Sequence, residues 1–447
     1  QSWDSTLYKN VELVANASSA AELDNLIEKI TAKLDDAHVE GLTYNVNSFF
    51  NKAYKPRLLL RYMDNKYVVV KTGIPGVAVG DEIVSVDGLT TTQWEDSLQH
   101  DISAGNPDVF RRFVCEYLLG GDLSSGINIV LRNATNNTYT ANHTRGTYMY
   151  NQWFSDYYPN DTLKNAKWTT LDCNVGYVHM GNLEQTDVSN MYADLLTKPA
   201  IIFDIRNYPQ GTAFTLANLM YPDRRMFAHD TEPEVTYPGA FRWFEHFLGP
   251  TSNSTDYKGK IILLMNQETQ SHAEYSCMIF EAMPDVVKVG SPTAGADGNI
   301  TYFNLTNDMQ TGFTTLGIYY PNNNSTQRVG IVPDSLVYPT QAGTRAGRDE
   351  ILEKAMQIGC AVSVRTNQLA NVSAKIYPNP ANNILNVELP AGQSVSVTIT
   401  DVTGRTLLQT DIDNTSKRIN ITSLPQGLYL LKMESNERQQ TYKFVKQ

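Results

Sequence analysis

The sequence has no long hydrophobic segment and no cluster of basic residues. A membrane-spanning helix needs about 20 consecutive apolar residues, and no such run occurs among its 447 residues. Lysine and arginine are scattered, and the formal net charge is −11. Because phosphate binding needs clustered positive charge, we expect neither a transmembrane segment nor a nucleic-acid partner.

Cysteine is also scarce, and no two cysteines form a CxxC pair. A metal-thiolate site is therefore not expected, and no other metal or cofactor is predicted. The predicted state of the cysteines is buried free thiols, with disulfides as the alternative. The four positions are Cys115, Cys173, Cys277 and Cys360.

What is present indicates a folded protein of several domains. Hydrophobic residues make up 41% of the chain and charged residues 19%, which is normal for globular proteins. At roughly 150 residues per domain, the length predicts about three domains. Local patterns divide the chain into an N-terminal helical segment (1–56), a strand-rich segment (57–140), an α/β core (141–365) and a C-terminal β-sandwich (374–447).

The first segment contains one amphipathic helix, predicted over residues 19–34. Leucine and isoleucine follow helical spacing in this stretch, and Ser19 with Glu22 three residues later forms a capping-box pattern. The helix is expected to end near residues 35–38, immediately before or at His38.

The second segment predicts short strands separated by turns. Asp87 and Gly88 favour a tight turn after the third of them. Residues 73–88 resemble the core of a PDZ-like domain, although any β-hairpin with such a turn remains an alternative. The three predicted strands are 58–60, 67–70 and 83–86.

The core segment alternates strands with helices. Residues 201–205 and 261–265 are continuous apolar runs, as expected of strands buried on both faces. A helix is predicted over 273–283 and a third strand over 286–289. Strands that alternate with helices indicate a parallel sheet with crossover helices.

A candidate nucleophile, Ser271, lies between the second buried strand and the following helix. A serine at a helix N-terminus lies beside unpaired N–H groups and the positive end of the helix dipole. Taken alone, such a serine is more often an N-cap than a nucleophile.

Four ordered motifs give this serine a family context. The chain resembles the tail-specific (C-terminal processing) and tricorn-like serine peptidases of Bacteroidetes. The resemblance implies a multidomain α/β fold with a crotonase-like (ClpP-like) ββα catalytic core and an inserted PDZ-like domain. The motifs are 204–211, 266–274 with 290–298, 330–334 and 347–355.

The resemblance also implies residue roles. Ser271 aligns with the nucleophile, and Ala296 stands where tail-specific proteases have a lysine, which excludes a Ser-Lys dyad. His38 resembles the histidine of the tricorn-like branch and is the predicted general base. The backbone N–H groups of His272 and Gly211 are the predicted oxyanion donors.

The third member of the triad is predicted at Gln327, where the tricorn-like branch has a glutamate. A glutamine can hydrogen-bond the imidazole but cannot stabilise imidazolium with charge. Another carboxylate could serve instead, and the sequence does not choose among Asp36, Glu274 and Asp297.

The last segment alternates apolar and polar residues, as half-exposed strands do. It resembles the type A sorting domain of the type IX secretion system, which implies a β-sandwich, recognition by that secretion machinery, and a secreted or cell-surface location. The motifs that carry the resemblance are 375–381, 401–405, 424–429 and 443–447. The predicted core residues are Val395, Val397, Ile399, Leu428, Leu430 and Met433.

The expected function is that of an exported serine peptidase that hydrolyses peptide or protein substrates through an acyl-enzyme at Ser271. A protein that retained the fold but only binds peptides is the alternative. Gln327 and Gln210, which replaces the first glycine of a family Gly-Gly pair, favour it. Hydrolysis of a non-peptide ester is a third possibility, since a serine site alone does not specify the acyl group.

Overall fold

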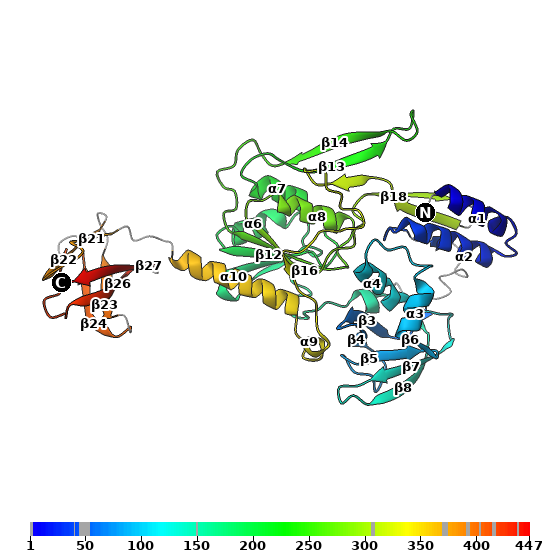
Figure 1. The fold of residues 1–447 in the computed structure, drawn as a ribbon, viewed down its shortest axis with the longest axis horizontal. Helices are drawn as coiled ribbons and strands as arrows, with labels where there is room; N and C mark the ends of the chain where they lie inside the picture. The colour runs from blue at the N-terminus through cyan, green and yellow to red at the C-terminus, as the bar shows by residue number, and fades with distance from the viewer. Residues whose placement is uncertain are drawn as a thin grey trace. The chain divides into compact units, whose positions relative to one another are not determined.

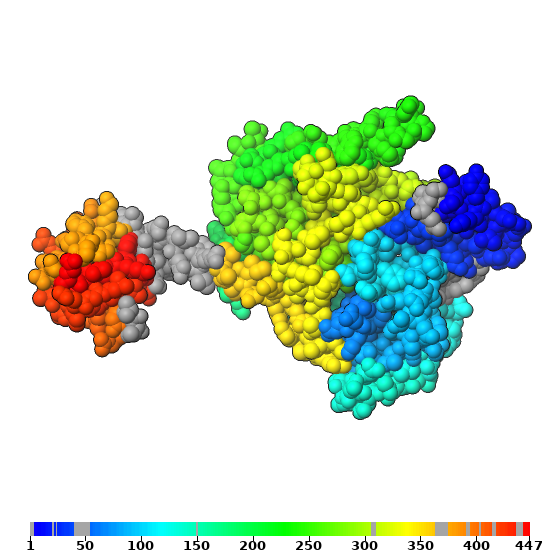
Figure 2. Space-filling view, viewed as in Figure 1, coloured from blue at the N-terminus to red at the C-terminus, as the bar shows by residue number. Residues whose placement is uncertain are grey.

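The chain divides into two compact units, Gln1–Gly359 and Cys360–Gln447 (Figures 1 and 2). Of the four predicted segments, only the C-terminal one approximates a unit, and the boundaries among the other three stay predictions. The computed structural model describes residues 3–39, 41–43, 54–148, 151–304, 309–368, 374–389, 394–401, 404–413, 417–435 and 438–447.

The N-terminal residues form helices α1 (Trp3–Ala15) and α2 (Ala20–Thr31), then a short 3-10 helix, η1 (Ala32–Leu34). Ser19 Oγ accepts a hydrogen bond from the Glu22 N–H at 3.2 Å, as predicted. The Glu22 carboxylate accepts from Ser18 rather than from Ser19, so the predicted capping box is only half formed. Asp35 has a left-handed φ of 51° and ends the helix, which directs the chain into the loop that carries His38.

A module over residues 54–148 is built on an antiparallel sheet in the order β3-β4-β5-β7-β8. Asp87 and Gly88, with φ of 49° and 84°, form the predicted tight turn between β5 and β6. The PDZ-like identity of this module stays a prediction. Its elements are β2 (Tyr54–Lys55), β3 (Leu58–Met63), β4 (Lys66–Thr72), β5 (Glu82–Val86), β6 (Leu89–Thr90), α3 (Thr91–Leu98), α4 (Pro107–Tyr117), β7 (Gly126–Arg132), β8 (Thr138–Thr144) and β9 (Thr147–Tyr148).

The core sheet has the strand order β10-β11-β12-β15-β16-β20. Strands β10 and β11 are antiparallel, and the other neighbouring pairs are parallel, as the alternating pattern predicted. The strands are β10 (Trp168–Leu171), β11 (Val175–His179), β12 (Ala200–Asp204), β15 (Lys260–Met265), β16 (Val286–Gly290) and β20 (Ser335–Leu336).

Helices cover both faces of this sheet (Figure 1). Ile201 and Phe203 of β12 pack into the cluster that contains α6 (Val188–Leu195), α7 (Ala213–Met220) and α8 (His272–Glu281). Ala200 and Ile202 pack into the cluster that contains the first turns of α10 (Glu350–Gln368). Since all four side chains are fully buried, the predicted two-sided burial is confirmed.

Two small sheets complete the first unit. The strand pairs β1–β18 and β18–β17 are antiparallel, and Gly41 pairs with Thr311. The segment just after His38 therefore lies beside the strand that ends at Thr314. The bounds are β1 (Gly41–Thr43), β17 (Ile300–Asn304) and β18 (Met309–Thr314); β13 (Arg225–Pro233), β14 (Phe241–Leu248) and β19 (Gly317–Tyr319); and α5 (Gln152–Ser155), η3 (Asp172–Asn174) and α9 (Gln341–Arg345).

The second unit packs two antiparallel sheets around one core, in the orders β21-β22-β25 and β24-β23-β26-β27. The predicted inward positions of β23 are confirmed. In β26 the prediction is partly wrong: Met433 is buried, but Leu428 is 46% exposed and Leu430 is half-buried, because residues of opposite parity point to opposite faces. The strands are β21 (Lys375–Tyr377), β22 (Ile384–Glu388), β23 (Val395–Asp401), β24 (Thr406–Ile412), β25 (Arg418–Asn420), β26 (Gly427–Ser435) and β27 (Arg438–Lys446).

The cysteines are of two kinds. Cys115 and Cys277 are buried free thiols, as predicted. Cys173 and Cys360 are disulfide-bonded, so the expectation of free thiols is wrong for them. Widely spaced cysteines carry no local signal for pairing, because the fold alone decides which of them meet.

Candidate active site

Ser271 occupies a strained position between β15 and α8. Its φ of 59° and ψ of −126° are unusual for a residue other than glycine. The Ser271 N–H donates to Ala296 O at 2.9 Å, and its carbonyl accepts from the N–H groups of Glu274 and Tyr275. These backbone bonds fix the serine at the first turn of the helix, as the strand-serine-helix pattern predicted.

A buried carboxylate joins this turn to the turn after β16. Glu274 accepts hydrogen bonds from the N–H groups of Ser271, Gly295 and Ala296 and from the Thr293 hydroxyl. Burial is the largest influence on its pKa and raises it, while these donors lower it. Glu274 thus binds the two motif turns together, and none of these bonds reaches His38.

His38 is buried in the loop that follows α2 and η1. Its backbone N–H donates to Asp36 Oδ1 at 3.0 Å, and the Asp36 N–H donates to Ser103 Oγ at 2.9 Å. The His38 ring makes one hydrogen bond among the described residues, between Nδ1 and Thr314 Oγ1 at 2.9 Å. Burial lowers the pKa of His38, Asp36 raises it, and Arg112 lowers it, so the ring is neutral near pH 7.

The same Thr314 is bonded to Asp36 through two further contacts. The Thr314 hydroxyl donates to Asp36 Oδ1 at 2.9 Å, and the Thr314 N–H donates to Asp36 Oδ2 at 2.7 Å. His38, Thr314 and Asp36 therefore form a continuous hydrogen-bonded chain.

Gln270 links the serine turn to the histidine loop. Its Nε2 donates to Ala37 O at 3.2 Å, and its Oε1 accepts from Arg112 of α4 at 2.9 Å. The residue before Ser271 is therefore bonded to the residue before His38. Segments separated by more than two hundred positions in the sequence meet at this contact, while the pairing of Ser271 with His38 itself stays a prediction.

The two predicted oxyanion residues are neighbours. Gly211 has a left-handed φ of 75°, and a Cβ built there would lie 3.9 Å from His272 Nε2. The His272 ring stacks on Phe214 with centroids 5.8 Å apart, and burial lowers its pKa. Gln210, next to Gly211, donates to Gly181 O at 3.2 Å.

Gln327 is not bonded to His38. Its N–H donates to Ser325 Oγ at 3.2 Å, and its side chain makes no hydrogen bond to any residue in the part of the chain that the structure describes. The hydrogen bond to the His38 ring comes from Thr314 instead. Spacing alone could not indicate this, because His38 and Thr314 are 276 positions apart.

Asp297 differs from the other two carboxylates that the sequence left open. It is buried, and neither oxygen forms a hydrogen bond of normal geometry with the described residues, although the nearby Thr326 side chain lowers its pKa. Burial and the charge of nearby Glu274 raise its pKa well above the usual range. Burial therefore favours the neutral form of Asp297 over the charged form, compared with an exposed aspartate.

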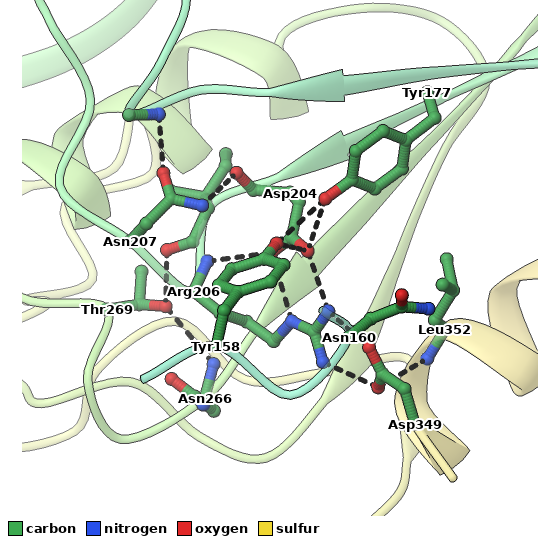
Figure 3. Close-up of polar contacts among 12 residues, drawn as sticks. Tyr158, Asn160, Tyr177, Asp204, Arg206, Asn207, Asn266, Thr269, Asp349 and Leu352 are labelled. Carbon is green, nitrogen blue, oxygen red and sulfur yellow. Dashed lines mark hydrogen bonds and ion pairs between the residues drawn. The ribbon is translucent and has the colours of Figure 1, made fainter. Parts of the chain in front are cut away.

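Behind the serine turn lies an ionic network that the sequence did not reveal (Figure 3). Arg206 donates to Asp204 at 3.0 and 2.6 Å and to Asp349 at 2.7 and 2.8 Å. Thr269, two residues before Ser271, donates its hydroxyl to Ile205 O at 2.8 Å. The end of β12, the start of α10 and the serine turn are thus held in one bonded set.

Comparisons with known proteins agree with this architecture. Residues 174–337 match the model of peptidase family S41, and residues 375–447 match that of the secretion system C-terminal sorting domain. No curated protein matches the sequence.

Solved structures resemble the chain in fold. Mature CPAF complexed with lactacystin has 12% identity and a TM-score of 0.64, over 82% of this chain and 94% of that chain. Mature CPAF alone gives 12% identity and a TM-score of 0.62, over 82% and 92%. A photosystem II D1 C-terminal processing protease matches at 18% identity over 75% of this chain and 87% of that chain, with a TM-score of 0.42.

A cavity of about 1050 Å³ lies beside the turn that leads to Ser271, but the candidate catalytic residues do not line it. It is lined by residues of β3 and α4 and by the turn 266–268 that leads to Ser271. Arg61 of β3 and Glu268 form an ion pair at 3.2 Å in its wall. The module over residues 54–148 therefore contacts the serine turn directly.

The described residues contain neither a candidate metal site nor a candidate membrane-spanning helix. Within them, no group of three or more histidine, cysteine, aspartate or glutamate side chains could hold a metal ion. No helix among these residues is both long and apolar enough to cross a membrane.

Proposed function

We propose that this chain is an exported serine peptidase that cleaves peptide bonds through an acyl-enzyme at Ser271. The observation that carries the proposal is the junction at Gln270, where the strained Ser271 turn is bonded to the loop of a buried, neutral His38. An imidazole that is neutral near pH 7 can accept the proton of a serine hydroxyl.

In the proposed reaction, His38 removes the proton from Ser271 Oγ as this oxygen attacks the substrate carbonyl carbon. The N–H groups of His272 and Gly211 stabilise the oxyanion, and the positive φ of Gly211 allows its backbone to approach. His38 then gives its proton to the leaving amine as the C–N bond breaks. Water hydrolyses the resulting ester by the same steps and regenerates Ser271.

The other parts of the chain support roles around this centre. The module over residues 54–148 contacts the serine turn through Arg112 and Arg61, and a PDZ-like fold would let it capture a peptide by strand addition. The C-terminal match supports export by the type IX secretion system to the cell surface or beyond.

A fluorophosphonate serine-hydrolase probe tests this function on the full chain. We expect the wild type to be labelled, with labelling abolished in Ser271→Ala and strongly reduced in His38→Ala. Because His38 must be neutral to act and its pKa is lowered, the labelling rate should rise with pH and reach half its maximum below pH 6.5. Labelling that persists in Ser271→Ala would refute the assignment of the nucleophile.

The alternative is a peptide-binding protein with the same fold and no turnover. Gln327 in place of an acidic residue and Gln210 in place of a glycine favour it. A folded wild-type chain that the probe does not label, yet that binds peptides, would make this alternative the better description.

A further inference from the structure

The neighbours of His38 include a carboxylate that reaches the ring through a hydroxyl. Thr314 Oγ1 lies 2.9 Å from His38 Nδ1 and 2.9 Å from Asp36 Oδ1. Asp36 also accepts the N–H groups of Thr314 and of His38 itself. The Asp36 carboxylate therefore accepts hydrogen bonds from both Thr314 and His38, the two residues whose positions it would fix.

The number of hydrogens available in the hydrogen bonds His38–Thr314–Asp36 determines which nitrogen of the His38 ring is protonated. A threonine hydroxyl has one hydrogen, and each oxygen of Asp36 already acts as an acceptor, Oδ1 for the His38 N–H and Oδ2 for the Thr314 N–H. The hydroxyl hydrogen therefore points to Asp36, and Thr314 Oγ1 can only accept from His38. Nδ1 must then carry the ring hydrogen, which leaves the lone pair of Nε2 free to receive a proton.

We propose that Thr314 and Asp36 are positioning residues that replace the orienting carboxylate of a serine-histidine-acid triad. Thr314 holds the Nδ1–H tautomer, and Asp36 supplies, through the hydroxyl, the negative charge that stabilises imidazolium. This inference rests on the proposed function. It differs from the prediction at Gln327, whose side chain makes no hydrogen bond to His38 among the described residues.

Several elements set the geometry of the chain of bonds. Strand pairing of β1 with β18 brings Thr314 to the histidine loop, and Ser103 fixes the Asp36 backbone. The charged groups that act on the ring are Asp36 from its own loop and Arg112 from α4, which oppose each other. Removing the Asp36 charge leaves Arg112 unopposed, so His38 should then be protonated only at lower pH.

The test measures the fluorophosphonate labelling rate of the full chain against pH. Thr314→Val, which keeps the shape but removes the hydroxyl, should lower the plateau rate by about 10- to 100-fold. Thr314→Ser should recover it to within about threefold, because serine keeps the hydroxyl. Asp36→Asn should lower the rate and move the acid limb to lower pH, which a merely structural role would not do.

The adjacent Thr315 provides a matched control. Its hydroxyl bonds Thr301 at 2.8 Å and does not contact His38, so Thr315→Val should label like the wild type. A Thr314→Val variant that labels at the wild-type rate, or a Thr314→Ser variant as slow as Thr314→Val, would overturn the proposal.

A spectroscopic measurement separates this inference from the proposed function. Nitrogen-15 NMR of histidine-labelled protein, with His38→Ala to assign the signal, should show Nδ1–H in the wild type and a changed tautomer ratio in Thr314→Val. If the probe fails to label a wild type that shows this signal, the proposed function fails and the positioning role of Thr314 stands. A wild-type ring protonated at Nε2 would refute the positioning role whatever the labelling.

Discussion

Three carboxylates surround the serine turn and the histidine loop, and their hydrogen bonds separate their roles. Asp36 accepts from Thr314 and from the His38 backbone. Glu274 accepts from the turns of Ser271 and Gly295. Asp297 has the Thr326 side chain nearby but forms no hydrogen bond of normal geometry with the described residues. Of the three, Asp36 is the one joined to the His38 ring by hydrogen bonds, through Thr314. The sequence could not choose among the three because all of them are carboxylates and only their hydrogen bonds differ.

Asp297→Asn should stabilise the protein increasingly as pH rises above about 4. The folded-state pKa of Asp297 is raised above its ordinary 3.8, so the folded state binds a proton that the unfolded state releases. Stability is lost between pH 3.8 and the folded pKa, by up to about 1.4 kcal/mol per pH unit. Asparagine resembles the protonated acid and lacks this loss.

Urea unfolding of wild type and variant at pH 4, 6 and 8 measures the difference. The exposed Asp161→Asn is the control, and its effect should be within about 0.5 kcal/mol at each pH. A stability difference for Asp297→Asn that does not change with pH would contradict the raised pKa.

The sequence predicted the place of a residue where the pattern of its chain neighbours indicated it. It did not predict contacts between residues that only the folding of distant segments brings together. The place of Ser271 was predicted correctly because a strand, a turn and a helix follow one another around it, while its role as nucleophile came from the family resemblance and stays a prediction. Thr314 was missed because it meets His38 only through the pairing of β1 with β18. Gln327 was assigned by family spacing, which gives a position in the chain but not the direction of a side chain.

At the scale of elements, the site depends on how the serine turn is joined to the histidine loop. Gln270→Ala removes the bonds to Ala37 and Arg112. We expect a fall of about tenfold or more in the labelling rate, since small displacements of catalytic groups are costly. Its melting temperature should change little, because the side chain is only partly buried.

Gln267→Ala in the same turn is the matched control. Its side chain accepts only a long bond from Ser291 at 3.3 Å, and the backbone carbonyl that bonds Arg112 is kept. Equal losses of labelling in the two variants would show that Gln270 has no special linking role.

Arg206 connects β12 to the start of α10, and its loss should be strongly destabilising. Arg206→Met leaves Asp204 and Asp349 buried without their cation, which costs about 3–5 kcal/mol. By comparison, the exposed pair of Arg225 with Asp223 at 2.6 Å should contribute at most about 1 kcal/mol. Urea unfolding of Arg206→Met and Arg225→Met compares them, and similar losses would contradict the importance of burial.

Strands were predicted best where the pattern of apolar residues allowed a single interpretation. Continuous apolar runs correctly indicated β12 and β15, since both faces of each strand are buried. The alternation in β23 was also correct, but Leu428 and Leu430 of β26 face outward. Hydrophobicity alone does not reveal which parity of a strand faces the core, because either face can carry leucine.

For the whole molecule, each unit has hydrophobic core clusters of its own, which predicts that the units fold independently. A chain ending at residue 368 retains α10 and both disulfide-bonded cysteines. It should keep the probe-labelling rate of the full chain within about twofold. A truncated chain that is folded by circular dichroism but labelled far more slowly would show that the second unit contributes to the site.

Helix α10 gives the first unit a late step of assembly. Arg206 bonds Asp349, which lies 143 positions further along the chain, and Ala200 and Ile202 are covered by residues of the helix that follows. A chain growing from its N-terminus therefore carries a sheet with one incompletely covered apolar face until this helix has been made. During synthesis the first unit stays an unfinished domain until this helix has been made, and only a chain that includes α10 can hold the serine turn in place.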